Sequence, residues 1–336
     1  MYIYTLRRLL FAVPTLLVIS FIIFAILDLS PGDPMSQVPL TVPPDVRAKI
    51  IETLGLNEPF HIRYLLWLNQ FFINEPLNLI QEWTGIAIGD PDRLRVRSWI
   101  TKAPVVDLIV QRLPQTLWVV GLAYLFGVLL AVPIGVISAY KQYSWFDQLG
   151  TLFSLIGFSV PTFLMGTIFI LVFAVNLGWF PDSYDTTLQV RDWPSFLRQV
   201  EQMVLPVSVL ALFNAAQISR FMRASMLENL TQDYVRTARS KGLRERIVLL
   251  THVLRNSMIP VVTIIAIGIP QIFAGAIITE QIFRVNGLGA LLIVGIEGAD
   301  YPLVQTLTFI FAVLIVLFNL IADILYGILD PRIRYD

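Results

Sequence analysis

The chain has 336 residues, of which 56% are apolar and 14% charged, with a formal net charge of zero. With a positive mean hydropathy, this composition excludes an ordinary soluble domain, gives no sign of nucleic acid as a partner, and indicates a polytopic membrane protein. The absence of cysteine excludes disulfides, thiolate metal sites and cysteine nucleophiles.

Six stretches are apolar and long enough, or nearly so, to cross a hydrocarbon core of about 30 Å, which needs about 20 helical residues. They predict an all-α fold with six transmembrane helices and both termini on one side. The first stretch exceeds a signal-peptide core and is not followed by a cleavage motif, so we expect an uncleaved helix. The predicted spans are residues 9–27, 117–139, 152–177, 203–219, 259–278 and 303–329.

The basic residues predict which side the termini occupy. Lys and Arg beside short loops are retained in the cytoplasm. Two short loops carry only Arg191, Arg198 and Arg284, and the charges of the long segment 28–116 carry little weight in this rule. The N- and C-termini are therefore predicted to be cytoplasmic. The basic residues that support this lie before the first span, after the second, between the fourth and fifth, and at the end: Arg7, Arg8, Lys141, several within 220–255, Arg332 and Arg334.

This topology predicts three parts. Residues 1–27 form the N-terminal segment and first span, residues 28–116 form an extracytoplasmic subdomain, and residues 117–336 form a core of the other five spans with a cytoplasmic loop at 220–258. Helical spacing of apolar residues predicts short helices at 45–54, 59–72 and 103–118, whereas 74–101 is predicted as a loop or short elements.

The cytoplasmic loop has a helical pattern over residues 231–255, interrupted at Gly242. Thr231 or Asp233 is a suitable cap for the first piece, and a glycine suits the left-handed residue that ends it. In the second piece apolar residues recur on one face, with basic residues away from its centre. Such a helix either lies on anionic lipid or inserts into a groove of a partner protein, and composition alone favours lipid. The apolar face comprises Leu243, Ile247, Leu250 and Leu254.

Polar residues inside spans are candidates for a translocation path, because an ionisable group costs about 2.5–3.5 kcal/mol at a helix centre. Asp323 and Asn319 form an i, i+4 pair in the sixth span, for which interhelical hydrogen bonding is the alternative. Asn214 and Gln217 form a similar pair in the fourth span, and Gln271 lies in the fifth. For Asp323 and Asn319, packing and a role in transport are both open. For Asn214 and Gln217, the two roles are equally favoured.

The outer end of the fifth span carries a further polar group. Glu280, Gln281 and Arg284 lie there, near Asp300 and Tyr301 in the sequence. These residues either line an outer gate or belong to a solvated loop, and the loop is the simpler expectation.

Several catalytic motifs are absent. The chain has no Gly-x-x-x-x-Gly-Lys-Ser/Thr phosphate loop, so energy for transport must come from a partner or a gradient. Only His61 and His252 are available as imidazole ligands, which gives no metal-binding cluster. Ser240 and Lys241 are adjacent, and adjacent helical residues do not face each other, so a Ser–Lys hydrolase is not indicated.

Four sequence blocks resemble the permease subunits of ATP-binding cassette importers, and among them the dipeptide and oligopeptide permease family. They are RRLL with SPGDP in 4–34, PVVDLIVQRLPQT in 104–116, YVRTARSKGL with HVLRNSMIPVV in 234–262, and EQIFRVNGLGALLIVGIEGADYPLVQ with NLIADILYGILDPRIRY in 280–335. The chain resembles the first-type subunit. It departs from the family's Glu-Ala-Ala signature, because Arg236 and Thr237 occupy the first two of those positions, whereas Ala238 and Gly242 agree with the signature. Ile259-Pro260 lies farther on than in the general signature.

The resemblance implies a type I importer permease fold in the inner (plasma) membrane, with a coupling helix that enters an ATPase subunit. The implied partners are a second homologous permease subunit, two ATPase subunits or domains, a substrate-binding protein and the lipid bilayer; ATP and Mg²⁺ would bind the ATPases, and no cofactor is expected in this chain. The implied cargo is a di- or oligopeptide, with nickel or glutathione as alternatives. The coupling residues implied are Tyr234, Arg236, Ala238, Lys241, Gly242, Leu243, Arg244 and Ile247.

The segment 74–101 and a competing functional class are considered next to this resemblance. Residues 74–101 look longer than the family norm, and contact with the binding protein is a hypothesis for them. The competing class is a self-contained secondary transporter or channel, in which internal repeats are frequent. No block of this sequence recurs as a second copy.

Overall fold

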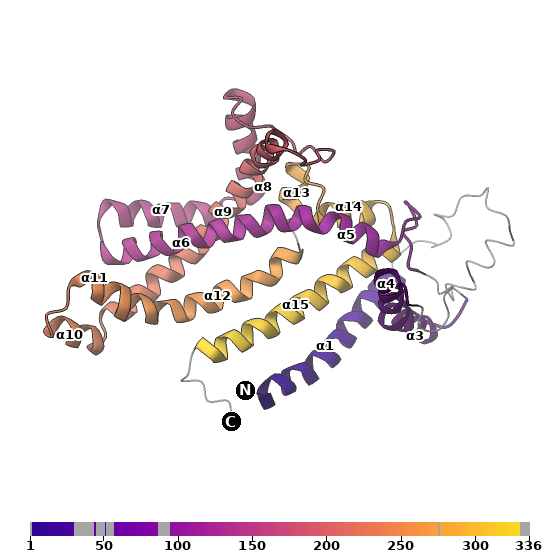
Figure 1. Cartoon of the computed structure of the whole chain (residues 1–336), viewed down its shortest axis with the longest axis horizontal. Coiled ribbons are helices and arrows are strands. Elements are labelled where there is room, and N and C mark those ends of the chain that lie inside the picture. Colours follow the sequence, from indigo (N-terminus) through magenta and orange to yellow (C-terminus); the bar gives the residue numbers. More distant parts are fainter. Residues whose placement is uncertain are drawn as a thin grey trace. The chain divides into compact units, whose positions relative to one another are not determined.

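The computed structural model describes residues 2–29, 44, 51, 57–86, 95–274 and 276–329 (Figure 1). Five helices in this part of the chain are long and apolar enough to cross a membrane, and a bent helix pair makes six. The all-α fold with six spans is thereby confirmed, with the third span bent. The predicted helix at 45–54, apart from residue 51, and Arg332 and Arg334 lie outside the described residues. The five spans other than the bent pair are Arg7–Asp28, Val105–Tyr140, Trp193–Leu230, Glu245–Pro270 and Tyr301–Ile324.

The chain divides into two compact units. Unit 1 comprises Met1–Leu10, Leu113–Ala290 and Leu314–Asp336, and unit 2 comprises Phe11–Arg112 and Leu291–Val313. Each unit has its own packing, described in turn below.

The centre of unit 1 is the crossing of α6 (Leu122–Tyr140) and α9 (Trp193–Leu230). Two glycines of α6 bring the helices into close approach, since a Cβ on Gly127 would lie 2.7 Å from the Cβ of Asn214, and one on Gly135 would lie 2.5 Å from the Cβ of Met222. Small residues at helix crossings are typical of membrane proteins, where association depends on close packing. The glycines of this span therefore serve the α6–α9 contact.

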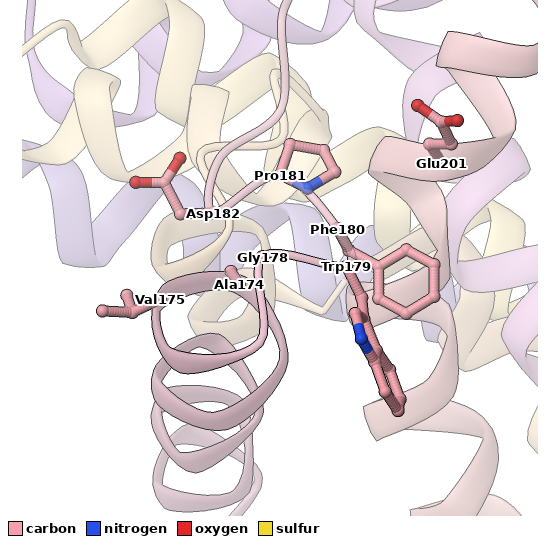
Figure 2. A pocket seen from close by; sticks show the side chains of 8 residues that line it. All are labelled: Ala174, Val175, Gly178, Trp179, Phe180, Pro181, Asp182 and Glu201. Carbon is pink, nitrogen blue, oxygen red and sulfur yellow. The ribbon is translucent and has the colours of Figure 1, made fainter.

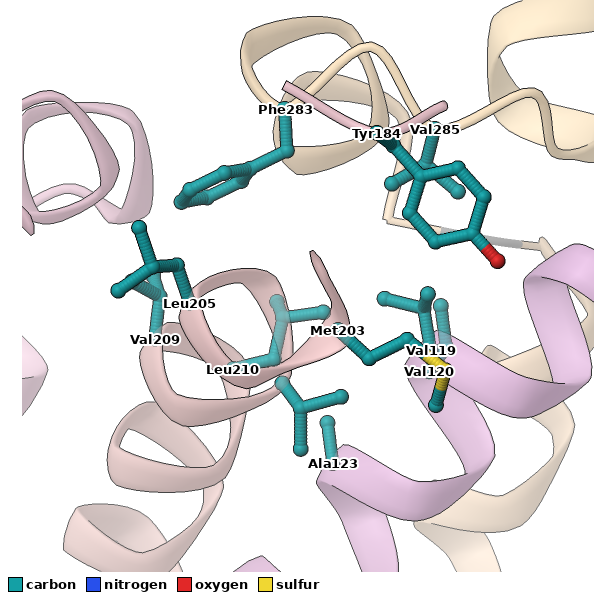
Figure 3. Packing of buried hydrophobic residues seen from close by; sticks show 11 residues of the cluster. Val119, Val120, Ala123, Tyr184, Met203, Leu205, Val209, Leu210, Phe283 and Val285 are labelled. Atoms are coloured by element: carbon teal, nitrogen blue, oxygen red, sulfur yellow. The ribbon is translucent and has the colours of Figure 1, made fainter. Parts of the chain in front are cut away.

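One buried cluster of unit 1 joins this crossing to the loops beside it (Figure 3). Figure 3 shows side chains from α6 and its preceding turn facing side chains from α9, with three loop residues above them. The predicted helix 103–118 and second span are continuous, because α5 (Val105–Thr116) runs through the π-helical turn η3 (Leu117–Gly121) into α6. The labelled cluster residues are Val119, Val120, Ala123, Tyr184, Met203, Leu205, Val209, Leu210, Phe283 and Val285.

The third span starts earlier than predicted and is sharply bent. Residues 152–177 were predicted as one span, and α7 (Trp145–Ser159) meets α8 (Thr162–Phe169), extended by η4 (Ile170–Asn176), at 106°. The bend follows from Pro161, because a proline pushes the preceding residue out of the helical region. Val160 accordingly has φ −85° and ψ 121°.

The fourth and fifth spans differ from prediction in their bounds. α9 has 38 residues, so the predicted stretch 203–219 is only the middle of a longer helix. The predicted fifth span 259–278 is wrong at its end, since α12 (Leu254–Ala274) stops earlier and α13 (Ile277–Ile282) starts a separate helix. Ala276 between them has a non-helical φ of −98° and ψ of 70°. The remaining helices are α14 (Leu288–Glu297) and α15 (Tyr301–Leu329).

Unit 2 packs α3 (Phe60–Asn69) and η2 (Gln70–Asn74) against α1 (Tyr2–Asp28) and α15 through aromatic rings. Trp67 meets Phe24 at 6.1 Å and Phe309 at 5.5 Å between ring centroids, and Arg63 pairs with Asp28 at 2.6 Å. The predicted helix at 59–72 is confirmed.

The segment 74–101 was predicted as a loop or short elements. It contains a helix, α4 (Glu75–Thr84). α4 is closed by Gly85 in the left-handed region, φ 71°. Residues 87–94 lie outside the described part, and Arg97 then forms an isolated antiparallel bridge with Pro104.

Candidate functional site

The candidate site is the stretch from residue 231 to residue 253, here called the α10–η5 segment. It consists of α10 (Asp233–Ser240), a turn at Gly242, α11 (Glu245–Ile247) and the π-helical turn η5 (Val248–Val253), which continues into α12. Gly242 has φ 76°, and its N–H donates to the carbonyl of Arg239 at 2.9 Å. The predicted left-handed glycine is confirmed.

The predicted cap of α10 is wrong. Gln232, rather than Thr231 or Asp233, takes the extended N-cap conformation, and its side chain makes no capping hydrogen bond. Asp233 instead lies in the first turn and Arg239 in the last turn of α10. Both positions suit the helix dipole, which favours negative charge at the N-terminus and positive charge at the C-terminus.

One face of the α10–η5 segment is anchored in the protein. Val235, Val248 and Val253 are fully buried and Ala238 is 5% exposed, all within one hydrophobic cluster that includes Met222 of α9. Fully burying a valine contributes about 1.5–3 kcal/mol. The segment is therefore held in place by its own packing, without a partner.

The opposite face presents exposed apolar side chains. Leu243 is 39% exposed, Ile247 45% and Leu250 61%, and these three belong to the apolar face predicted from the sequence. Leu254, the fourth, is half-buried at the start of α12. An apolar row that remains outside a well-packed anchor is typical of a contact surface.

Charged residues surround this row. Arg239 bridges the turn by pairing with Glu245 through Nη2 to Oε1 at 2.7 Å and Nε to Oε2 at 3.2 Å. Arg236 points into solvent with 85% of its side chain exposed and lies 4.0 Å from Asp233. Lys241 and Arg244 are also exposed. The surface is thus apolar at its centre and basic at its margins.

The structure places the eight predicted coupling residues unequally. Seven are exposed on the α10–η5 segment, whereas Ala238 is buried and can act only through packing. The exposed seven are Tyr234, Arg236, Lys241, Gly242, Leu243, Arg244 and Ile247.

The predicted path residues are not brought together. Asn214 and Gln217 are half-buried on α9, with Asn214 packed against Gly127 of α6. Asn319 is exposed on α15, and Asp323 pairs with Arg8 at 2.9 Å. This ion pair supports the alternative of an interhelical contact for Asp323. The side chain of Gln271 lies outside the described residues.

Glu280 was expected at an outer gate or in a solvated loop. The outer gate stays a prediction, whereas the solvated loop is wrong, because the Glu280 side chain is fully buried. Its Oε1 accepts the hydroxyl proton of Thr116 at 2.9 Å, and its Oε2 accepts the N–H of Ala290 at 3.0 Å. The Thr116 hydroxyl also accepts the N–H of Leu288 at 2.8 Å. Burial raises the pKa of the Glu280 carboxyl. This carboxyl therefore joins α5, α13 and α14 inside unit 1.

Asp300 plays a similar part in unit 2 and is also fully buried. It accepts the backbone N–H groups of Trp99 at 3.0 Å and Ile100 at 3.3 Å, and the hydroxyl of Ser98. The sequence placed Glu280 and Asp300 in one polar group, whereas the structure gives each its own set of donors.

A surface pocket of about 510 Å³ was not expected from the sequence. It lies where η4 ends, and Figure 2 shows the carboxylates of Asp182 and Glu201 on opposite sides of it, with Trp179 and Phe180 between them. The left-handed Gly178, φ 62°, forms the turn at its edge. The only sequence signal was the Gly-Trp-Phe-Pro turn in 178–181, which is typical of any interfacial loop.

Comparison with known families and proteins gives a consistent result. Residues 131–335 match the family described as binding-protein-dependent transport system inner membrane component, and residues 1–120 match the family of its N-terminal part. The chain is 40% identical over 336 residues to the oligopeptide transport system permease protein AppB of Bacillus subtilis (strain 168), which covers 99% of each chain.

Two further relatives align over nearly the full length. A putative peptide transport system permease protein of Brucella abortus (strain 2308) is 35% identical over 332 residues, covering 98% of each chain. The glutathione transport system permease protein GsiC of Salmonella paratyphi A (strain ATCC 9150 / SARB42) is 33% identical over 336 residues, covering 99% of each chain.

Proposed function

This chain belongs to the family of binding-protein-dependent transport system inner membrane components, and we propose that it carries peptides as one permease subunit of an ATP-driven importer. Family membership and its apolar helices make it a multi-pass protein of the plasma membrane. The observation that carries the proposal is the two-faced α10–η5 segment, which is buried on one side and presents an apolar row with basic margins on the other.

The α10–η5 segment is the proposed docking surface for an ATPase subunit. An apolar helix face that inserts into a groove is a recurrent mode of recognition, and basic margins steer it toward a groove with an acidic rim. Lipid binding is the alternative for a basic amphipathic segment. The buried anchor formed by Val235, Val248 and Val253 favours docking, because it fixes the exposed row in one geometry before any partner arrives.

The proposed assembly contains a second permease subunit, two ATPase subunits and an extracytoplasmic binding protein. ATP is hydrolysed by the ATPase subunits, and this chain transmits their movement. In the proposed topology both termini and the α10–η5 segment are cytoplasmic, and residues 28–116 lie on the other side. Residues 74–101, which include α4, remain a candidate contact for the binding protein.

Peptides are the favoured cargo because the Bacillus relative is named an oligopeptide permease and the Brucella relative a putative peptide permease. Glutathione is the second candidate, supported by the name of the Salmonella relative. None of the three relatives described above is named for nickel transport. The polar residues Asn214, Gln217 and Asn319 remain the candidates for path contacts, with selectivity assigned mainly to the binding protein.

The docking proposal is tested by copurifying the permease with its ATPase subunits. We expect Leu243→Ser or Leu250→Ser to lower ATPase recovery about tenfold, the usual effect of losing one or two kcal/mol at the centre of an interface. Gly242→Ala probes the turn alone, since no atom lies within 4 Å of the added Cβ and only the left-handed backbone opposes it.

A matched control is Val190→Ser, another half-exposed apolar residue, which lies in the loop after η4. We expect normal ATPase recovery for this variant. Unchanged recovery and unchanged ATP-dependent uptake in the Leu243 and Leu250 variants would rule out docking through this surface.

A further inference from the structure

A partly buried ion pair, with Asp147 buried and the Arg223 side chain 29% exposed, connects α7 to α9 a short distance before the α10–η5 segment. Asp147 is 4% exposed and receives two hydrogen bonds from Arg223, Nε to Oδ1 at 2.6 Å and Nη2 to Oδ2 at 2.9 Å. A two-pronged guanidinium–carboxylate pair fixes both distance and orientation, more tightly than a single hydrogen bond does.

The turn before α7 is shaped around the same carboxylate. Tyr143 donates its backbone N–H to Asp147 Oδ2 at 2.9 Å and has a positive φ of 62°. A left-handed tyrosine is uncommon and costs about 1–2 kcal/mol, so surrounding contacts must hold it. Ser144 caps α7 by accepting the N–H of Asp147 at 3.3 Å. Asp147 thus fixes the turn between α6 and α7 as well as the contact to α9.

Small side chains form much of the rest of the α7–α9 crossing, together with one contact of a guanidinium with an aromatic ring. Ser154 and Ser219 meet at 3.2 Å through their hydroxyl groups, and a Cβ on Gly157 would lie 2.5 Å from the Cβ of Ala216. Such contacts bring the helices close. Arg220 of α9 also lies over the ring of Phe158 of α7, 5.2 Å from its centroid. The Asp147–Arg223 pair adds two directed, charge-assisted hydrogen bonds, which fix the distance and orientation of the helices more tightly than these contacts do.

Beyond Arg223, α9 is locked to α12 at the base of the α10–η5 segment. Ser225 donates its hydroxyl to the carbonyl of Ser257 at 2.9 Å, and Ser257 donates to the carbonyl of Ser225 at 3.3 Å. Both serines are buried. The segment between them is anchored by Val235 and Val248, so α9, the segment and the start of α12 form one continuously packed body.

We propose that Asp147 and Arg223 are positioning residues that make α7, the first half of the bent third span, move together with the α10–η5 segment. This inference rests on the proposed function and assigns a role to a helix that does not belong to that segment. A displacement of the segment by an ATPase subunit passes through the packed end of α9 to the ion pair and so to α7.

The charged nature of the pair supports positioning over stability alone. Replacing a buried ion pair with apolar residues of similar size is often neutral or stabilising, whereas removing one partner is costly. A two-pronged pair at a crossing that otherwise consists largely of small residues and the Arg220–Phe158 contact fits a geometric task. Arg223→Lys would keep the charge but lose the two-pronged geometry.

The test uses the complete transporter in proteoliposomes, with peptide uptake and ATP hydrolysis measured in the same preparation. We expect Asp147→Asn and Arg223→Lys to assemble and hydrolyse ATP while the peptide transported per ATP falls at least about fivefold, the low end of ordinary coupling between two sites. The double variant Asp147→Leu/Arg223→Met keeps apolar packing without the pair and should show the same loss. Ser154→Ala, at the same crossing, is the control and should retain the wild-type ratio.

The outcomes separate two questions. A wild-type ratio in any assembled Asp147 or Arg223 variant overturns the positioning role, and so does a failure of every variant to assemble, because the pair would then be structural. The absence of ATP-dependent peptide uptake in the wild-type transporter would instead contradict the proposed function itself.

Discussion

Glu280 and Asp323 are both acidic residues near the ends of predicted spans, yet their surroundings differ. Glu280 is fully buried among the donors of Thr116 and Ala290, whereas Asp323 is one-third exposed and paired with Arg8. The sequence suggested a transport role or an interhelical hydrogen bond for Asp323, and an outer gate or a solvated loop for Glu280. These expectations considered only neighbours along the chain. The partners that decide their roles come from other helices.

Removing the Glu280 carboxyl should destabilise the protein. Glu280→Ala leaves the Thr116 hydroxyl and the Ala290 N–H buried without an acceptor, at about 1–3 kcal/mol for each stranded group. We expect a lower thermal transition in detergent, measured by tryptophan fluorescence, and a smaller loss for Glu280→Gln, which keeps one acceptor oxygen. An equal transition for Glu280→Ala and the wild type would show that these hydrogen bonds contribute nothing.

The stability of the wild type should also depend on pH through this group. Burial raises the pKa of Glu280 in the folded state above its unfolded value. The stability gained from its protonation is therefore fully present below the unfolded pKa and lost as pH rises through the folded pKa. The thermal transition of the wild type should therefore fall relative to that of Glu280→Gln as pH rises from the ordinary pKa of a glutamate, about 4.3, through the raised pKa of the folded state. Parallel pH profiles would contradict this.

At the scale of elements, sequence periodicity identified helices well but not their breaks and junctions. The bend after Ser159 and the join of α5 to α6 both lie inside apolar stretches, where hydropathy is continuous. Pro161 supplied a local signal for the bend, yet prolines at 133 and 206 lie inside unbroken helices α6 and α9. Packing against neighbouring helices decides which proline interrupts a span.

The α6–α9 crossing gives a prediction at this scale. Gly135→Val places new atoms against Met222 and the carbonyl of Ser219, both within 2.8 Å of the added Cβ. We expect the helices to separate, at a cost of about 1–3 kcal/mol, with less folded protein recovered by gel filtration. Gly121→Ala is the matched control, since its Cβ meets only Ile272 at 4.0 Å. Equal recovery of both variants would exclude a packing role for Gly135.

At the scale of the whole molecule, topology and partners follow from features that reach beyond one helix. The charge rule predicts the sidedness of every loop, and the exposed row on the α10–η5 segment identifies the surface proposed for the ATPase. Unit 1 holds that segment, its anchor and the Asp147–Arg223 pair, and so contains the whole proposed route from the ATPase to α7.

The absence of cysteine allows a direct test of sidedness. Two single variants each introduce one exposed thiol. They are Lys241→Cys in the α10–η5 segment and Thr186→Cys in the loop before α9. In intact cells a membrane-impermeant maleimide should label Cys at position 186 and not at position 241, while both label after permeabilisation. The reverse pattern would invert the predicted topology.

The sequence alone determined the membrane class, the number of spans, the helical segment interrupted by Gly242 and the family resemblance. These depend on local quantities, namely hydropathy over a helix length, the spacing of apolar residues and the left-handed preference of glycine. A short-range pattern is sufficient for each, so no knowledge of distant neighbours was needed.

Only the tertiary structure decided which polar residues are buried, where the third span bends and what holds the α10–η5 segment in place. Glu280 meets Thr116 across 164 positions of sequence, and Arg223 meets Asp147 across 76. The free energy of a charged group depends on such partners and on its distance from water, and neither quantity is present in the order of residues along one helix.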